Sequence, residues 1–357
     1  MADTAHGIGG LKYDPKKRAK PPELNVFFAL VLIVVTFEVL GWLIYGQSFL
    51  FNTRDNVDAI FNWARINIII LQVSIIGIIA LGVTQVIISG GIDLSSGSIV
   101  GATAMIVMSF AQTAMVNGNP NPKAIFGEWA MDLPVLVPIL VGLVCGLIAG
   151  MINGLLIAYT KIPPFIATLG MMVSARGLSK WWSNGNPISF PTESFAAIGK
   201  GMMPVAIFVA LAILFHLVLK FTVYGKHTYA IGSNEDAARM SGIKVARHKV
   251  LVYSIAGTLA AVAAIVLSSK NLTAQAGMGV MYELDAIAMT VIGGVSLAGG
   301  RGSIIGTVLG ALIFGVIISG FTFLRLDAYY QEMVKGAIIV GAVVLDQWRQ
   351  GRAQLRS

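Results

Sequence analysis

Long apolar runs without any charged side chain dominate this sequence. Leu133–Thr160 contains no charged residue, and Ile66–Ile92 and Leu94–Pro122 are charge-free runs separated only by Asp93. A helix of about 20 apolar residues crosses the roughly 30 Å hydrocarbon core of a bilayer. Charged residues make up 12% of the chain and hydrophobic residues 56%, a balance that neither soluble domains nor disordered chains have. The chain is therefore predicted to be an integral membrane protein.

Ten segments are apolar enough to be predicted as membrane spans. The predicted fold is thus all-α and polytopic, with about ten transmembrane helices. The segments after Pro164 and near Leu284 are short, so re-entrant segments are the alternative at those two places. The predicted spans are Val26–Tyr45, Ile66–Ile92, Leu94–Pro122, Leu133–Thr160, Phe165–Trp182, Met203–Leu219, Leu251–Ser269, Leu284–Ala298, Ser303–Leu324 and Ala328–Leu345.

The distribution of basic residues predicts the orientation. With the N-terminus in the cytoplasm, the inside segments carry more Lys and Arg than the outside segments, as the positive-inside rule requires. An even number of spans then places both termini in the cytoplasm. The net charge of +8 is explained by this bias, and no nucleic-acid partner is expected. The predicted organisation is a basic cytoplasmic N-terminal segment at 1–25, a transmembrane domain at 26–346 with a cytoplasmic loop at 220–249, and a basic cytoplasmic tail at 347–357.

Glycine- and proline-rich breaks interrupt the apolar runs. A Gly-Ser-Ile-x-Gly pattern occurs at Gly97–Gly101 and again at Gly302–Gly306. Each copy follows a glycine-rich break, which indicates a weak internal repeat of the kind found in transporters, although small-residue packing motifs also recur by chance. A Pro-Pro pair cannot lie inside a regular helix, so it belongs either to a cavity-lining element or to an interfacial turn. The predicted structural breaks are Gly90, Gly91, Asp93, Pro163, Pro164, Gly299 and Gly300.

The sequence contains no motif that would make the chain an enzyme. A Gly-x-x-x-x-Gly-Lys-Ser/Thr loop is absent, so the chain is not expected to bind ATP in that way. The four histidines are dispersed along the sequence, which gives no support for a metal site. We expect no catalytic residue, no metal and no cofactor on this chain.

Neutral polar side chains lie within the predicted spans. Amides and hydroxyls suit an uncharged, polyhydroxylated solute, whereas ionisable groups at mid-span would indicate an ion or proton pathway. The alternative is that each of them hydrogen-bonds a neighbouring helix. The candidate pathway residues are Gln72, Ser74, Gln85, Asn153, Phe165, Thr168 and Ser174.

Three carboxylates carry predictions of their own. Glu332 lies three residues before Lys335, a spacing that allows the two to pair on one helix. Glu38 has no local partner and is expected to face a neighbouring span. Asp93 lies in a break, where its carboxylate is expected to cap the helix that follows.

The segment Ser233–Gly242 has the features of a short capped helix. Ser233 or Asn234 can cap it, two acidic residues follow in its first turn, and Gly242 can end it. At the cytoplasmic face, such a helix either docks into a groove of a partner or is a solvated surface helix.

Four stretches resemble ABC-type sugar importer permeases of the ribose, xylose and galactose class. In chain order they are Gly90–Ser98, Ile162–Gly170, Tyr229–Ile243 and Glu283–Gly302. Within that class the chain is most similar to the myo-inositol permease branch. The stretches that carry this narrower resemblance are Gln47–Phe49, Gly82–Ile88, Met171–Leu178, Gly320–Phe323 and Asp346-Gln347.

The resemblance implies a homodimeric permease subunit in the bacterial inner membrane. It implies a periplasmic binding protein that delivers a neutral sugar or polyol, with myo-inositol first and ribose, xylose or galactose as alternatives. It also implies a separate ATPase subunit that binds ATP and Mg²⁺. An ion-coupled secondary transporter is the alternative from another class. The residues expected to couple the permease to the ATPase are Ser233, Asn234, Glu235, Asp236, Ala237, Ala238, Arg239, Ser241 and Gly242.

Overall fold

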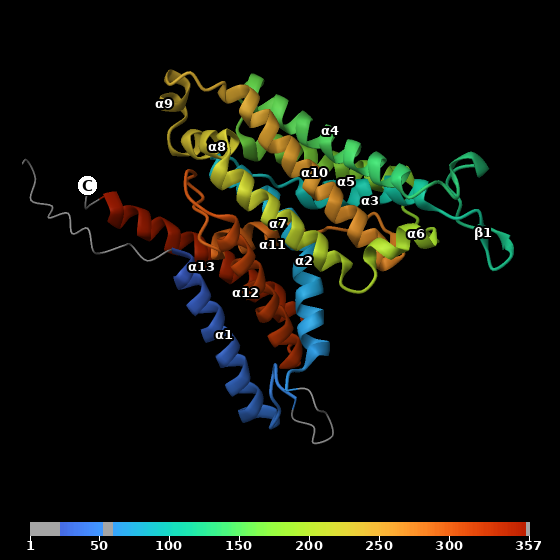
Figure 1. Cartoon of the computed structure of the whole chain (residues 1–357), viewed down its shortest axis with the longest axis horizontal. Coiled ribbons are helices and arrows are strands. Elements are labelled where there is room, and N and C mark those ends of the chain that lie inside the picture. The colour runs from blue at the N-terminus through green and yellow to red at the C-terminus, as the bar shows by residue number, and fades with distance from the viewer. Residues whose placement is uncertain (1–21, 53–59, 355–357) are drawn as a thin grey trace, which may run out of the picture.

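The computed structural model describes residues 22–52 and 60–354, and these ranges are mostly helical (Figure 1). Most of the predicted N-terminal segment at 1–25 therefore lies outside the described residues, as do positions 355–357 of the predicted tail. The longer helices are α1 (Pro22–Tyr45), α2 (Trp63–Ile88), α3 (Ser96–Ala111), α4 (Leu136–Thr160), α5 (Pro164–Trp182), α7 (Met203–Phe221), α8 (Val223–Ser233), α10 (Val245–Asn271), α11 (Tyr282–Ile292), α12 (Ile304–Phe323) and α13 (Ala328–Gln354). The short elements are β1 (Met115–Val116), β2 (Asn119–Pro120), β3 (Ile188–Ser189), α6 (Glu193–Ala196), α9 (Glu235–Met240) and β4 (Thr273–Ala274).

Each of the ten predicted spans overlaps a helix of the structure. The count of ten membrane spans is nevertheless not confirmed. In the described ranges, six helices are long and apolar enough to cross a membrane, namely α1, α2, α4, α7, α10 and α12. The predicted span at Leu284–Ala298 contains α11, which has 11 residues and covers about 16 Å at 1.5 Å per residue. It ends at Gly293 and Gly294, the second of which adopts a left-handed φ of 89°.

The predicted span at Leu94–Pro122 is also shorter in the structure. Its helix, α3, ends at Ala111, and the chain then forms the β1–β2 hairpin. Asn117 and Gly118 form the turn with φ angles of 52° and 79°, and Asn-Gly is a strong hairpin signal. A charge-free run thus contains a turn that apolarity alone does not reveal.

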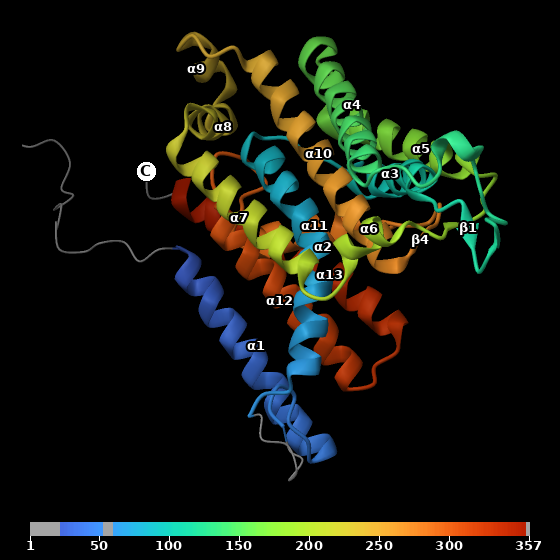
Figure 2. The ribbon, with the colours of Figure 1, turned by 45° about the vertical axis from the view of Figure 1, so that its right-hand side comes forward.

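The most buried helices lie at the centre of the bundle. About two thirds or more of the apolar windows of α2, α10 and α12 are buried, whereas α1, α4 and α7 are largely exposed. In both views α10 crosses the molecule between α7 and α4 (Figure 2). The described structure therefore has an inner group of helices and an outer group whose apolar side chains suit contact with lipid.

A ladder of glycines joins α4 to α10. Gly142, Gly146, Gly150 and Gly154 recur every four residues on α4, and all four are buried. A Cβ at Gly146 would overlap the carbonyl oxygen of Gly257, and one at Gly150 would overlap that of Tyr253. Small residues at such spacing let two helix backbones approach closely within a membrane. The two helices run antiparallel, so the end of α4 lies beside the start of α10 (Figure 1).

The polar connections gather at two opposite ends of the bundle. Helices α8 and α9 lie at one end of α7 and α10, and the strand pairs lie at the other end (Figure 2). The start of α1 and the end of α13 lie on the same side of the molecule (Figure 1), as an even number of crossings requires. The domain boundaries and the cytoplasmic location of both ends stay predictions.

Candidate coupling site and pathway residues

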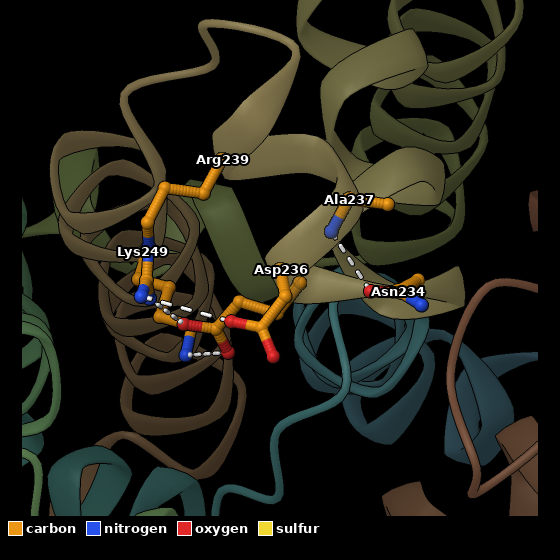
Figure 3. Close-up of polar contacts among 6 residues, drawn as sticks. Asn234, Asp236, Ala237, Arg239 and Lys249 are labelled. Carbon is orange, nitrogen blue, oxygen red and sulfur yellow. Dashed lines mark hydrogen bonds and ion pairs between the residues drawn. The ribbon is translucent and has the colours of Figure 1, made fainter.

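The segment predicted to couple to an ATPase folds as α9, a single short helix after α8. Asn234 caps it, because its Oδ1 accepts a hydrogen bond from the backbone N–H of Ala237 at 2.9 Å (Figure 3). Gly242 ends the turn that follows, with a φ of 85°. The predicted short capped helix is therefore present.

Ion pairs hold α9 against the start of α10. The Glu235 carboxylate lies 2.9 Å from the Arg239 guanidinium and 2.7 Å from the Lys249 ammonium (Figure 3). On the inner face, Ala238 is buried in a cluster with Ile231 and Val245. The outer face is open, and the side chain of Met240 is 88% exposed. One face of α9 is anchored on the protein and the other is exposed.

The two glycine-rich breaks of the predicted repeat meet each other beneath α8. The backbone N–H of Gly300 donates to the carbonyl oxygen of Ile88 at 2.8 Å. Gly232, near the end of α8, packs into this junction so closely that a Cβ would overlap the Ile88 carbonyl oxygen. A Cβ on Gly299 would lie 3.1 Å from the Cα of Gly90 and 2.7 Å from the Gly232 carbonyl oxygen. We call this contact the glycine junction.

Tyr229 ties α8 to the second break as well. Its hydroxyl donates to the carbonyl oxygen of Gly302 at 2.8 Å. Burial raises the pKa of the Tyr229 phenol, and the nearby Glu23 carboxylate raises that pKa further. The phenol therefore stays neutral and keeps its proton for this bond. Helix α8 thus contacts the breaks of both halves through backbone and side-chain atoms.

The prediction that Asp93 caps the helix after the break is wrong, because Ser95 holds the N-cap position of α3 and the Asp93 carboxylate binds Ser95 itself. One oxygen of the Asp93 carboxylate accepts from the backbone N–H of Ser95 at 2.8 Å and from its hydroxyl at 2.6 Å. Asn153 of α4 joins this network, since its Nδ2 donates to the Ser95 hydroxyl at 2.8 Å. All three residues are buried. This network fixes α4 to the loop between α2 and α3.

The candidate pathway residues fall into two groups. Ser74, Gln85, Asn153 and Thr168 are fully buried and hydrogen-bond to protein atoms. The Gln85 Oε1 accepts from the Tyr224 hydroxyl of α8 at 2.8 Å, and the hydroxyls of Ser74 and Thr168 donate to carbonyl oxygens of their own helices at 2.8 Å and 2.9 Å. The second group, Gln72, Phe165 and Ser174, is exposed on the surface. The assignment of all seven to a solute pathway stays a prediction.

The Pro-Pro pair lies in a turn between two helices. Helix α4 ends at Thr160 and Lys161 follows in the left-handed region. Pro163 then precedes α5, and Pro164 is its first residue, where the missing N–H costs no helical hydrogen bond. The break changes the chain direction without kinking either helix.

A buried ionic group is the feature that sequence reasoning missed. The predicted pairing of Glu332 with Lys335 is wrong, because the Lys335 ammonium lies 3.2 Å from the Asp285 carboxylate of α11. Asp285 is buried and would otherwise carry an uncompensated charge, whereas Glu332 is exposed. The signal was available, because Asp285 falls inside a predicted span, where an ionisable residue requires a partner.

Two further charged residues bind backbone groups. The Arg176 guanidinium of α5 donates to the carbonyl oxygen of Met278 at 2.9 Å, and Glu283 is its electrostatic partner. Glu38 accepts from the backbone N–H groups of Phe49 and Leu50 at 2.9 Å and 2.6 Å. Its main partner is therefore the loop after its own helix.

Comparisons with known proteins identify the family. The family described as "Branched-chain amino acid transport system / permease component" matches residues 65–343. The chain is 42% identical over 283 residues to the ribose import permease protein RbsC of Bacillus subtilis, covering 77% of this chain and 82% of that protein. It is 36% identical over 356 residues to RbsC of Escherichia coli K12, covering 97% and 100%.

A galactose permease is a relative at similar identity. The galactose/methyl galactoside import permease protein MglC of Escherichia coli K12 is 39% identical over 296 residues, covering 80% of this chain and 86% of that protein. No solved structure is a significant match. A match over most of the chain, together with these relatives and the apolar helices, shows that this multi-pass inner-membrane protein belongs to that family of transport-system permease components.

Proposed function

We propose that this chain is the permease subunit of an ATP-driven importer for a neutral sugar or polyol. Its relatives are import permeases for ribose and galactose, which are polyhydroxylated and uncharged. A separate ATPase would bind ATP and Mg²⁺ and dock on α9. A periplasmic binding protein would deliver the solute on the opposite side of the membrane.

The glycine junction is the observation that carries this proposal. An element that converts ATP binding into transport must link a docking surface to the segments that move. Helix α9 offers an open outer face, and α8, directly before it, contacts the breaks of both halves at Gly232 and Tyr229. A displacement of α9 would therefore reach both breaks at once.

Changes on the open face of α9 test the docking. Met240→Asp and Ala237→Arg alter exposed side chains and should reduce copurification of the ATPase several-fold, while the amount of permease in the membrane stays unchanged. Trp129→Asp, at an exposed residue near the strand pairs, is the control and should leave copurification intact. Normal copurification and normal coupling of hydrolysis to uptake in both α9 variants would refute the docking.

For the solute, the proposal favours myo-inositol, on the resemblance of the stretches at Gly82–Ile88 and Met171–Leu178. Ribose, xylose and galactose are the alternatives, and the ribose and galactose relatives support them equally well. Uptake of radiolabelled inositol, ribose, xylose and galactose should be compared in a strain that lacks this chain and in the same strain after complementation. Loss and recovery of inositol uptake alone supports the proposal, and unchanged uptake of all four solutes refutes it.

The proposed assembly is a homodimer with the exposed face of α5 at its centre. Gly170, Ser174 and Gly177 lie on that face, and a Cβ on either glycine would meet nothing within 4 Å. Faces with small residues at this spacing allow two helices to approach. Cysteines placed at Ser174 in a Cys145→Ser background should form a crosslinked dimer in membranes, whereas cysteines at the exposed Leu147 of α4 should not.

An ion-coupled transporter is a second candidate, favoured by the buried carboxylates of Glu283 and Asp285. Asp285 pairs with Lys335 at 3.2 Å, which is the arrangement of a structural pair. Arg176 is an electrostatic neighbour of Glu283 and forms no ion pair with it within 4 Å. An uncoupler added while ATP is kept high distinguishes the two mechanisms. Uptake that persists supports the ATP-driven importer, and uptake that stops supports the ion-coupled one.

A further inference from the structure

A strongly basic groove lies beside α9, where α4 ends and α10 begins. It measures about 710 Å³, and five of its lining residues are basic: Lys161, Arg239, Lys244, Arg247 and Lys249. Glu235 is the one acidic residue in the lining, and it already pairs with Arg239 and Lys249. We call this cavity the basic groove.

Three of the five cations have no counter-charge among the residues that the structure describes. No carboxylate in the described ranges lies within 4 Å of the side-chain nitrogens of Lys161, Lys244 or Arg247. Two of these cations flank the start of α10, which has no acidic residue in its first turn and no side-chain cap. Cations at a helix N-terminus are unfavourable, because the macrodipole is positive there. An anion in the groove would relieve both effects.

The exposed face of α4, which adjoins the groove, indicates the source of that anion. Leu140, Val144, Leu147, Met151 and Leu155 form an exposed stripe along α4, on the side away from its glycine ladder. All are large and apolar, which suits contact with lipid tails better than the close approach of another helix.

The stripe continues into the groove itself. The stripe ends at Tyr159, which is 61% exposed and lines the groove two residues before Lys161. Tyrosine at the end of a span is typical of the headgroup level of a bilayer. The acyl chains of a lipid along α4 would therefore place its headgroup among the unpaired cations.

We propose that the basic groove binds the phosphate of an anionic phospholipid of the inner leaflet. Basic pockets between transmembrane helices on the cytoplasmic side suit such headgroups, and the positive-inside rule assigns this end of the spans to the cytoplasm. The groove is lined on one side by the turn at Pro163 and Pro164 and on the other by residues of α9 and α10. A bound headgroup would bridge the turn between α4 and α5 to the helix proposed to dock the ATPase.

Native mass spectrometry of the purified full-length chain tests whether the basic groove binds an anionic phospholipid. Dioleoyl phosphatidylglycerol should remain bound to the native chain, and dioleoyl phosphatidylcholine should not. The triple variant Lys161→Gln, Lys244→Gln and Arg247→Gln alters exposed side chains and should bind phosphatidylglycerol at least about tenfold more weakly, because each basic residue at an anionic surface contributes to binding. A matched control, Lys123→Gln, Lys180→Gln and Lys200→Gln, removes equal charge near the opposite end of the spans and should retain binding.

Further variants and a competition experiment distinguish a lipid site from other causes of weaker binding. The charge-preserving variant Lys161→Arg, Lys244→Arg and Arg247→Lys should restore binding, and the single variant Lys244→Gln should give a partial loss. Equal losses of phosphatidylglycerol binding in the groove variant and in its control would overturn the proposal. So would removal of the lipid by 10 mM inorganic phosphate, which would indicate a site for free anions. Loss of ATPase copurification with unchanged lipid binding would also overturn it, because the groove would then be a surface for the ATPase.

Discussion

The backbone N–H of Gly300 donates a 2.8 Å hydrogen bond to the carbonyl oxygen of Ile88. Ile88 is the last residue of α2 and Gly300 precedes α12, so this bond joins the breaks of the two predicted repeat halves. The close approach of Gly232 places the end of α8 on the same bond.

A methyl group at Gly232 is expected to disrupt the junction. Gly232→Ala would place a Cβ on the Ile88 carbonyl oxygen, and overpacking of this kind costs about 1–3 kcal/mol. Uptake should fall while the membrane level of the chain changes less. The control is Gly336→Ala, where a Cβ would meet nothing within 4 Å. Equal uptake in the two variants would contradict the role of the junction.

Tyr224→Phe separates two roles for Gln85. If Gln85 positions α8 through the 2.8 Å bond from the Tyr224 hydroxyl, then Tyr224→Phe and Gln85→Ala should reduce uptake by similar factors. If Gln85 instead contacts the solute, only Gln85→Ala should raise the KM for uptake. The geometry favours the first result, because Gln85 is fully buried. The initial rate of uptake against solute concentration is the measurement.

The glycine ladder of α4 is expected to be sensitive to size. Gly150→Val would push a side chain into the backbone of Tyr253 on α10. The expected cost is about 1–3 kcal/mol or more, visible as a lower Tm of the purified protein and a lower membrane level. Leu147→Phe adds volume on the exposed face of the same helix and should leave both quantities near the native values. A native Tm for Gly150→Val would show that the two helices separate without cost.

The pair of Asp285 and Lys335 should behave as a coupled unit. Asp285→Asn leaves the Lys335 ammonium without its partner, and removal of one member of a buried pair costs about 3–5 kcal/mol. A cost at the lower end of this range is expected, because the Lys335 side chain is 27% exposed. The double variant Asp285→Asn with Lys335→Met should recover part of the loss in thermal stability. If the loss in the double variant equals the sum of the losses in Asp285→Asn and in the single variant Lys335→Met, the pair contributes nothing to stability.

Much of the local structure could be predicted from the sequence. Charge-free runs located the helices, since a helix satisfies its backbone hydrogen bonds within its own segment in lipid. Asn234 and Gly242 predicted the bounds of α9, because capping depends on neighbouring residues alone. Asp93 is different, because its carboxylate binds the loop residue Ser95 and does not cap α3 as the sequence predicted.

The count of ten spans is not confirmed, and two of the predicted spans are shortened at glycine-containing turns. The Asn117-Gly118 turn is a sequence signal that the apolar count overrode. The end of α11 is a second local signal of this kind, because Gly294 adopts a left-handed φ of 89° directly after Gly293. Hydropathy contains no information about such a backbone conformation.

Partnerships across the bundle were decided by tertiary structure. Lys335 pairs with Asp285, fifty positions away, in preference to Glu332 on its own helix, because burial makes an unpaired carboxylate costly and exposure does not. In the same way, sequence alone marked Gly90 and Gly300 as breaks in two halves of the chain and gave no role to Gly232. Only the packing of α2, α8 and α12 brings them to one point, since a long-range contact depends on helix positions that no local pattern encodes.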